Sequence, residues 1–226
     1  MSYQLQFGEL TGYAGLFASG AATTLGLTAV ATALGLAVGV AGAAARNTGT
    51  PGLAWLRGAV GLYVEAIRNT PFLVQLFFLF FGLPALGIHI GAYAAAILAM
   101  TLNLGAYSVE IVRAGVAAVP RGHLEAAAAL AMSPAQTFRH VVLPQAFAKV
   151  FPALVSQIVI TMLGSAVVSQ ISVADLTYAA SYIQSRNFRA FETYFVITLA
   201  YLALALVLRA ALHAAGRQLF VRRAAR

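Results

Sequence analysis

Long apolar stretches separated by short polar ones run along the whole chain. The apolar stretches cover residues 16–45, 62–86, 92–112, 150–171 and 194–212. About 20 apolar residues in helical form cross the hydrocarbon layer of a bilayer, which is about 30 Å thick. The stretches are continuously apolar and lack the period-two alternation of barrel strands. The pattern therefore predicts an all-α membrane protein with about five transmembrane helices.

The composition agrees with a chain dissolved in lipid. Hydrophobic residues make up 61% of the 226 residues and charged residues 9%, whereas soluble domains carry about 25% charged residues. No linker or low-complexity segment divides the chain, so residues 1–226 are predicted to form a single transmembrane domain. The first 15 residues contain Glu9 and no Lys or Arg, and a signal-peptide core is shorter than the apolar stretch that follows. We expect that stretch to be retained as the first span.

The basic residues predict the orientation in the membrane. With the N-terminus outside, twelve of the fourteen Lys and Arg residues lie inside, and only Arg186 and Arg189 lie outside. Cytoplasmic loops keep more Lys and Arg than translocated ones. An outside N-terminus and a cytoplasmic C-terminus follow for this multi-pass membrane protein. The net charge of +8 is spread over several helix ends, which argues against a nucleic-acid partner.

The sequence shows no pattern of metal or nucleotide chemistry. It has no cysteine, and His89, His123, His140 and His213 do not have the spacing of metal ligands. It lacks a glycine-rich phosphate-binding loop with its lysine. We expect no metal or other cofactor on this chain, and no enzymatic activity of its own.

Two polar stripes fall within the apolar stretches. The first comprises Asn103, Tyr107 and Glu110, and the second comprises Gln157, Thr161, Ser165 and Ser169. These spacings place each set on one face of a helix. Polar groups are costly in lipid, so both faces should meet protein or water. The candidate substrate path consists of Gln75 and of both stripes except Glu110. The structural alternative is that these side chains form hydrogen bonds between helices. Glu110 is expected to pair with Arg113.

Proline and glycine mark two local features. Pro71 predicts either a kink near Thr70, whose exposed carbonyls need partners, or the start of a helix at the interface. Gly35 and Gly39 have the spacing that lets two helices approach closely in lipid, so they predict a packing face, with a dimer contact as one possible use.

A polar insert at residues 113–149 interrupts the apolar pattern. Residues 123–132 are rich in alanine and predict a helix. Ser133 and Gln136 have the spacing of a capping box around Pro134, which predicts the start of a second helix. We expect Pro144 to end or bend this helix before the fourth span. An apolar, alanine-rich helix in water predicts a protein partner.

At these residues the chain resembles the permease subunits of bacterial ATP-binding-cassette (ABC) importers. Their signature is Glu-Ala-Ala, three residues, Gly, nine residues, Ile, one residue and Leu-Pro. Glu125, Ala126, Ala127, Leu143 and Pro144 stand in that register, with Val141 in place of Ile. The departure is Ala131, which stands at the glycine position. Because alanine favours continued helix, the corner is expected to move to Met132 and Ser133.

The resemblance extends to the polar amino-acid branch of these importers through residues 68–76, 105–107, 110–113 and 171–176. It implies a type I importer fold with a cytoplasmic coupling helix and a dimeric permease core, formed with an identical or a sister chain. It also implies two ATPase subunits that bind ATP and Mg, and an extracytoplasmic amino-acid-binding protein. The implied function is ATP-driven uptake of a polar or charged L-amino acid. An ion-coupled secondary carrier is the alternative, although no inverted repeat supports it.

The resemblance also implies roles for the insert. Glu125 would make a polar contact with the ATPase, Ala126 and Ala127 would allow its close approach, and Leu143 and Pro144 would tie the insert to the fourth span. Residues 172–192 are too polar to span, and they predict either a docking surface for the binding protein or an interfacial helix with aromatic residues.

Overall fold

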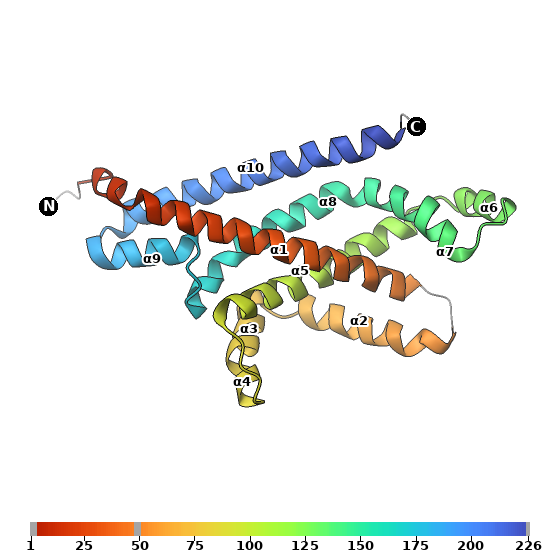
Figure 1. The fold of residues 1–226 in the computed structure, drawn as a ribbon, viewed down its shortest axis with the longest axis horizontal. Helices are drawn as coiled ribbons and strands as arrows, with labels where there is room; N and C mark the ends of the chain where they lie inside the picture. The colour runs from red at the N-terminus through yellow and green to blue at the C-terminus, as the bar shows by residue number, and fades with distance from the viewer. Residues whose placement is uncertain (1–3, 48–50, 225–226) are drawn as a thin grey trace.

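The structure, a computed structural model, describes residues 4–47 and 51–224, and these form helices without any strand. The first half comprises η1 (Gly8–Tyr13), α1 (Ala14–Asn47), η2 (Pro51–Leu53), α2 (Ala54–Arg68), α3 (Phe72–Phe77), η3 (Phe78–Gly82), α4 (Leu83–Ala85) and α5 (Ala92–Ala117). The second half comprises α6 (Arg121–Ala129), α7 (Pro134–Thr137), η4 (Phe138–Val142), α8 (Leu143–Gly164), η5 (Ser165–Ile171), α9 (Leu176–Asn187) and α10 (Ala190–Ala224). In Figure 1, α6 and α7 lie at one end of the bundle and α9 lies at the other.

Four continuous helical segments are long and apolar enough to cross a membrane. They are Gly8–Asn47, Ala92–Ala117, Pro134–Ile171 and Ala190–Gln218. Each contains one of the predicted spans, which confirms the first, third, fourth and fifth apolar stretches as helices.

The second predicted span, residues 62–86, is broken rather than one straight helix. Its helix α2 begins at Ala54, and it is separated from the segment Phe72–Ala85 by a bend of 111°. Pro71 is the residue before α3 and has an extended backbone, so the kink is the correct one of the two readings. In Figure 1, α3 and α4 point away from the bundle as an arm. Arg68 ends α2, and its guanidinium lies 5.4 Å from the centre of the Tyr107 ring in the middle of α5.

A seam of small residues joins α1 to α5, and the two helices run in the same direction (Figure 1). A side chain added at Gly35 would meet Leu104 at 3.0 Å, and one added at Gly39 would overlap Ser108. The predicted packing face is therefore used within the chain, because both glycines allow α5 to approach. The two helices form one closely packed unit.

The insert folds as two helices joined by a tight corner. Ala129 is the last residue of α6, Leu130 is its C-cap, and Ala131 has a φ of 52°. The amides of Ala131 and Met132 donate to the carbonyls of Ala128 (2.9 Å) and Ala127 (3.1 Å), the bond pattern of a Schellman motif. The prediction that the corner moves to Met132 and Ser133 is wrong, because the hydrogen bonds of the motif hold alanine in the left-handed conformation.

The second helix of the insert begins as predicted but does not end at Pro144. Ser133 and Gln136 form the capping box. The π-helical turn η4 follows α7 and leads into α8, so the chain is helical from Pro134 to Ile171. Pro144 lacks an amide hydrogen, and it lies in the first turn of α8, directly after the wider turn. The proline thus marks a local change of helix geometry rather than a break.

Buried polar groups organise the α9 end of the bundle. Asp175 is fully buried and caps α9 by accepting from the Tyr178 amide at 2.8 Å, and it accepts from the Tyr201 hydroxyl at 3.2 Å. Burial raises the pKa of the Asp175 carboxyl. Arg189 joins the buried Glu192 (3.2 Å) to Glu9 (3.2 Å) and so fastens the N-terminal segment to α10. Two acidic groups predicted in a polar surface segment, Asp175 and Glu192, are therefore interior.

The helix α10 covers one side of the bundle and is largely exposed. Only 6% of its apolar 18-residue stretch is buried, and its main contacts are with α8 and α9. Near the insert end, Gly216 lies against the ring of Phe151, and a side chain added at this glycine would overlap that ring. A glycine is therefore needed where α10 crosses α8.

Candidate functional site

A cavity of about 430 Å³ lies between the α2–α3 break, α5 and α8. Its lining consists of Thr70, Pro71, Phe72, Asn103, Tyr107, Gln157, Ile160, Thr161 and Gly164. Four of these residues, Asn103, Tyr107, Gln157 and Thr161, belong to the predicted substrate path. The two polar stripes therefore do meet across one space.

Several polar groups in this cavity can bind a ligand. Among the described residues, neither the Tyr107 hydroxyl nor the Gln157 side-chain amide has a hydrogen-bond partner. The Asn103 amide donates to Gln75 at 3.0 Å, which leaves its own oxygen as an acceptor. Thr161 donates to the backbone carbonyl of Gln157 at 2.9 Å. Hydroxyl and amide groups that protein does not pair are suited to a small polar molecule.

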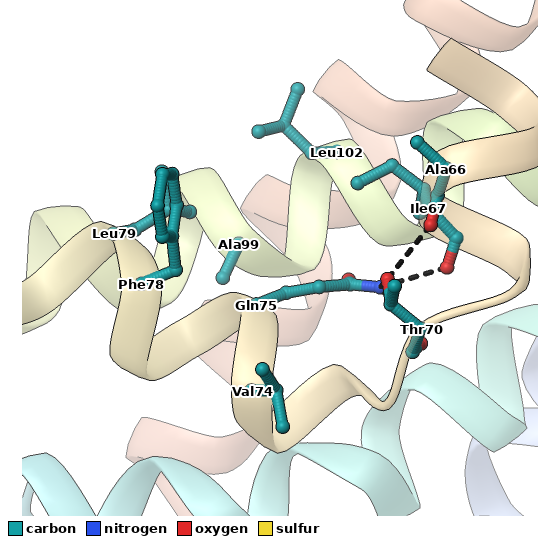
Figure 2. Close-up of a pocket in the computed structure, with 9 residues that line it drawn as sticks. All are labelled: Ala66, Ile67, Thr70, Val74, Gln75, Phe78, Leu79, Ala99 and Leu102. Carbon is teal, nitrogen blue, oxygen red and sulfur yellow. Dashed lines mark hydrogen bonds between the residues drawn. The ribbon is translucent and has the colours of Figure 1, made fainter. Parts of the chain in front are cut away.

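Gln75 has a different position from the one predicted. It does not line this cavity but closes the α2–α3 break, as Figure 2 shows. Its side-chain amide donates to the carbonyls of Ile67 (2.7 Å) and Thr70 (3.0 Å), and its oxygen accepts from Asn103. Unpaired carbonyls are costly in the membrane interior. Gln75 therefore supplies the partners that the break was predicted to need.

A second cavity of about 420 Å³ lies between α2, α3 and α5 and is almost wholly apolar (Figure 2). Val74, Phe78 and Leu79 line it from the arm, and Ala99 and Leu102 line it from α5. Gln75 lies at its polar end. This cavity is a groove of hydrocarbon side chains rather than a site for polar chemistry.

Ser165 and Ser169 do not line the polar cavity. The Ser165 hydroxyl is buried and donates to the Met162 carbonyl at 2.7 Å, and the Ser169 hydroxyl donates to the Ala166 carbonyl at 2.9 Å. Both belong to η5, a 3₁₀ helix with about three residues per turn. Residues four positions apart therefore no longer lie on the same face of the helix beyond Gly164. Ser165 and Ser169 accordingly do not belong to the wall of the polar cavity.

Charged groups lie toward the insert end of the polar cavity. The Arg68 guanidinium lies 5.4 Å from the centre of the Tyr107 ring. Glu110, one turn further along α5, contacts Arg113 at 2.7 Å, which agrees with the predicted pairing. It also contacts Arg46 of α1 at 2.6 Å. This partner was not predicted, because it lies far from Glu110 in the sequence. This end of the cavity therefore carries more positive than negative charge.

The insert presents a different surface from the one predicted. Glu125 and Ala126 are exposed, whereas Ala127 is 2% exposed and is the buried residue of α6. Since α6 packs against η4 and α7, the small side chain of Ala127 serves packing within the insert. The expectation that it makes room for a partner is corrected accordingly. Leu130, 77% exposed at the corner, is the apolar residue that sequence reasoning overlooked.

Three other residues of the predicted coupling set lie at the corner and at the start of α8. Ala131 forms the corner, and Leu143 and Pro144 are half-buried at the start of α8. Thr70, Pro71 and Phe72 were missed as cavity residues, although the sequence signal of the break marked their position. Within the described ranges, no group of three or more His, Cys, Asp or Glu side chains could hold a metal ion.

Comparison with known proteins assigns the class. Residues 31–220 match the family described as binding-protein-dependent transport system inner membrane component, and the chain belongs to this family. It is therefore a permease subunit of the inner membrane and not a secondary carrier.

Particular relatives support the same class. The chain is similar to the glutamine transport system permease protein GlnP of Escherichia coli (strain K12), with 35% identity over 85% of this chain and 88% of that protein. It is 37% identical to the L-cystine transport system permease protein TcyB of Bacillus subtilis (strain 168), over 73% of this chain and 69% of that one.

Solved structures confirm the fold. A crystal structure of an amino acid ABC transporter with histidines matches with a TM-score of 0.85 and 36% identity, covering 96% of this chain and all of that one. The MetNI methionine ABC transporter matches with a TM-score of 0.76 at 22% identity, over 91% of this chain and 96% of that one. The type I importer permease fold predicted from the sequence is thus confirmed.

Proposed function

We propose that this chain is the permease subunit of an ATP-driven ABC importer that moves a polar amino acid into the cytoplasm through the cavity between α5 and α8. The observation that carries the proposal is the cavity itself, in which the Tyr107 hydroxyl and the Gln157 amide have no partner among the described residues. The names of the relatives, which are permeases for glutamine and L-cystine, support an amino acid as the substrate.

A second permease chain, identical or sister, covers the side that carries the α2–α3 break. Glu65, Arg68 and Asn69 are exposed there, and Arg68 lies beside the middle of a spanning helix. Charged side chains and irregular backbone do not face lipid at such depth, but they can line a water-filled space enclosed by protein. The arm adds exposed aromatic side chains, with Phe78 69% and Phe81 60% exposed. Both features support a permease dimer with the cavity at its centre.

Energy enters through the insert, which faces the cytoplasm in the proposed orientation. Two ATPase subunits bind ATP and Mg, and this chain holds no cofactor. Each ATPase receives one insert, with the exposed Leu130 and Glu125 as the contact residues. The insert connects directly to α5 on one side and α8 on the other, and these helices carry the polar walls of the cavity. A movement of the insert therefore changes the distance between the walls.

The mechanism requires that ATP binding favour one state of the permease. The closed ATPase dimer must hold the two inserts better in the outward-open state than in the inward-open state, because a ligand shifts an equilibrium only by its differential affinity. Hydrolysis then returns the cavity to the inward-open state. An extracytoplasmic binding protein delivers the amino acid at the α9 end, where Tyr178 and Tyr182 are partly exposed.

Reconstitution of the complete transporter tests this function. Proteoliposomes that hold the permease, the ATPase and the binding protein should take up a labelled amino acid with ATP, and a protonophore should leave the uptake unchanged. Leu130→Asp should reduce both ATPase capture and uptake, because it places a charge on the apolar contact. Gln218→Asp, an exposed change near the end of α10, is the control. Uptake that depends on an ion gradient and not on ATP would refute the proposal.

A further inference from the structure

From the chemistry of the polar cavity we infer a selectivity of the permease itself: the cavity accepts amino acids with an uncharged polar side chain, such as glutamine, and rejects those with a cationic side chain. This inference rests on the proposed function of the cavity as the substrate path. It names a substrate class that is set by this chain, separately from any preference of a binding protein.

The polar lining is neutral throughout. Thr70, Thr161 and Tyr107 contribute hydroxyl groups, and Asn103 and Gln157 contribute carboxamides. These groups can donate to and accept from a carboxamide or a hydroxyl of the substrate. None of them offers a full negative charge to pair with a side-chain guanidinium or ammonium group. The α-ammonium group is common to all amino acids and does not distinguish among them. A cationic side chain would therefore lose its hydration in this cavity without gaining a counter-charge.

The carboxylates of the chain are committed elsewhere. The sequence contains six acidic residues. Glu9 and Glu192 contact Arg189, and Asp175 caps α9. Glu110 contacts two arginines. Glu125 lies on α6, outside the spans.

Glu65 is the sixth acidic residue, and it precedes Thr70 of the cavity lining by five residues. It does not line the cavity, and its carboxylate accepts from the Asn69 side chain at 3.0 Å. It precedes Arg68 by three residues, which is about 4.5 Å along a helix axis. In sequence, Arg68 is therefore about one helical turn closer than Glu65 to the break that forms the cavity wall.

The charge beside the cavity lining is positive. The Arg68 guanidinium lies 5.4 Å from the centre of the Tyr107 ring, and that ring belongs to the lining. A positive charge at this place attracts the carboxylate of any amino acid and repels a cationic side chain. A second copy of the same chain would bring a second neutral lining and a second arginine, so dimerisation strengthens the selection.

Equilibrium binding to the purified permease–ATPase complex, without binding protein, tests the inference. Labelled L-glutamine should bind and be displaced by unlabelled L-asparagine, whereas L-arginine and L-lysine should compete at least about tenfold more weakly. Gln157→Glu should reverse the order by placing a carboxylate in the cavity, with arginine gaining about tenfold and glutamine losing affinity. Gln218→Glu makes the same chemical change outside the cavity and should leave the wild-type order intact.

Each outcome separates the inference from the function on which it rests. Should Gln157→Glu fail to assemble in gel filtration, Asn103→Asp places the carboxylate on α5 instead. Equal binding of arginine and glutamine by the wild type would overturn the inference, and so would cation binding that disappears in Glu65→Gln. Neither result affects ATP-driven uptake of an amino acid. The absence of ATP-driven uptake of any amino acid by the complete transporter refutes the proposed function instead.

Discussion

The corner between α6 and α7 places an alanine in a conformation that favours glycine, and this gives a prediction with a defined sign. Ala131 has a φ of 52°, and the amides of Ala131 and Met132 close the Schellman motif. The left-handed conformation costs an L-residue about 1–2 kcal/mol. Glycine avoids this cost but loses more chain entropy on folding, by roughly 0.5–1 kcal/mol. Ala131→Gly should therefore stabilise the corner by about 0.5–1 kcal/mol.

A matched substitution two residues earlier should have the opposite effect. Ala129 is the last residue of α6, has the right-handed helical conformation and is exposed, as Ala131 is. Glycine at a helical position costs up to about 1 kcal/mol relative to alanine. The two variants remove the same methyl group from neighbouring surface positions, so they differ chiefly in backbone conformation.

Hydrogen exchange of the purified permease–ATPase complex measures both effects. The protection of the amides that close the corner should increase about two- to fivefold in Ala131→Gly and decrease about fivefold in Ala129→Gly, because exchange from local opening follows the local free energy. Protection factors relative to the unstructured peptide rates correct for the change of residue. If Ala131→Gly lowered protection as Ala129→Gly does, the left-handed strain would not exist and the account of the corner would be refuted.

Three further predictions concern the interior. Gln75→Leu removes the donor that pairs two carbonyls at the end of α2, so it should cost about 1–3 kcal/mol and lower the melting temperature of the detergent-solubilised protein. Gly39→Ala should cost about 1–3 kcal/mol by forcing α1 from Ser108; Ser108→Gly should recover part of the loss, and Gly26→Ala, where space is open, should cost nothing. Burial raises the pKa of the Asp175 carboxyl. The protonated carboxyl therefore stabilises the folded protein below the ordinary Asp pKa, and this stabilisation is lost as the pH rises through the raised pKa. Asp175→Asn keeps a capping oxygen and should remove this decline in melting curves recorded across acidic to neutral pH; an unchanged decline would assign it to another group.

Much of the fold could be predicted because spanning segments leave a strong compositional signal. Four apolar stretches became helices that extend beyond the predicted limits, by as many as sixteen residues where the fourth begins at Pro134. The second stretch misled because α2 begins in a mixed segment that contains Trp55 and Arg57. Pro71 predicted the position of the break. The 111° angle of the bend could not be predicted from the local sequence, because it depends on how α3 packs against distant helices.

The candidate site was predictable where helix periodicity holds. Asn103, Tyr107, Gln157 and Thr161 line one cavity because α5 and α8 are regular along these residues. Ser165 and Ser169 were misplaced by a change to 3₁₀ geometry.

In the insert, Ala127 is buried while Ala126 is exposed. Composition cannot separate two adjacent alanines, because only the packing of α6 on η4 tells them apart.

The exposed helix α10 makes bilayer thickness a variable of this protein. Its candidate span Ala190–Gln218 contains 29 residues, which is about 44 Å of helix, against a hydrocarbon layer of about 30 Å. A helix longer than the layer tilts or extends beyond it, and its tilt changes with the length of the lipid chains. Because Gly216 abuts Phe151 of α8, a change of tilt is transmitted to the wall that carries Gln157. A change in the length of the lipid chains should thus change the position of this wall, although the lipids do not contact the cavity.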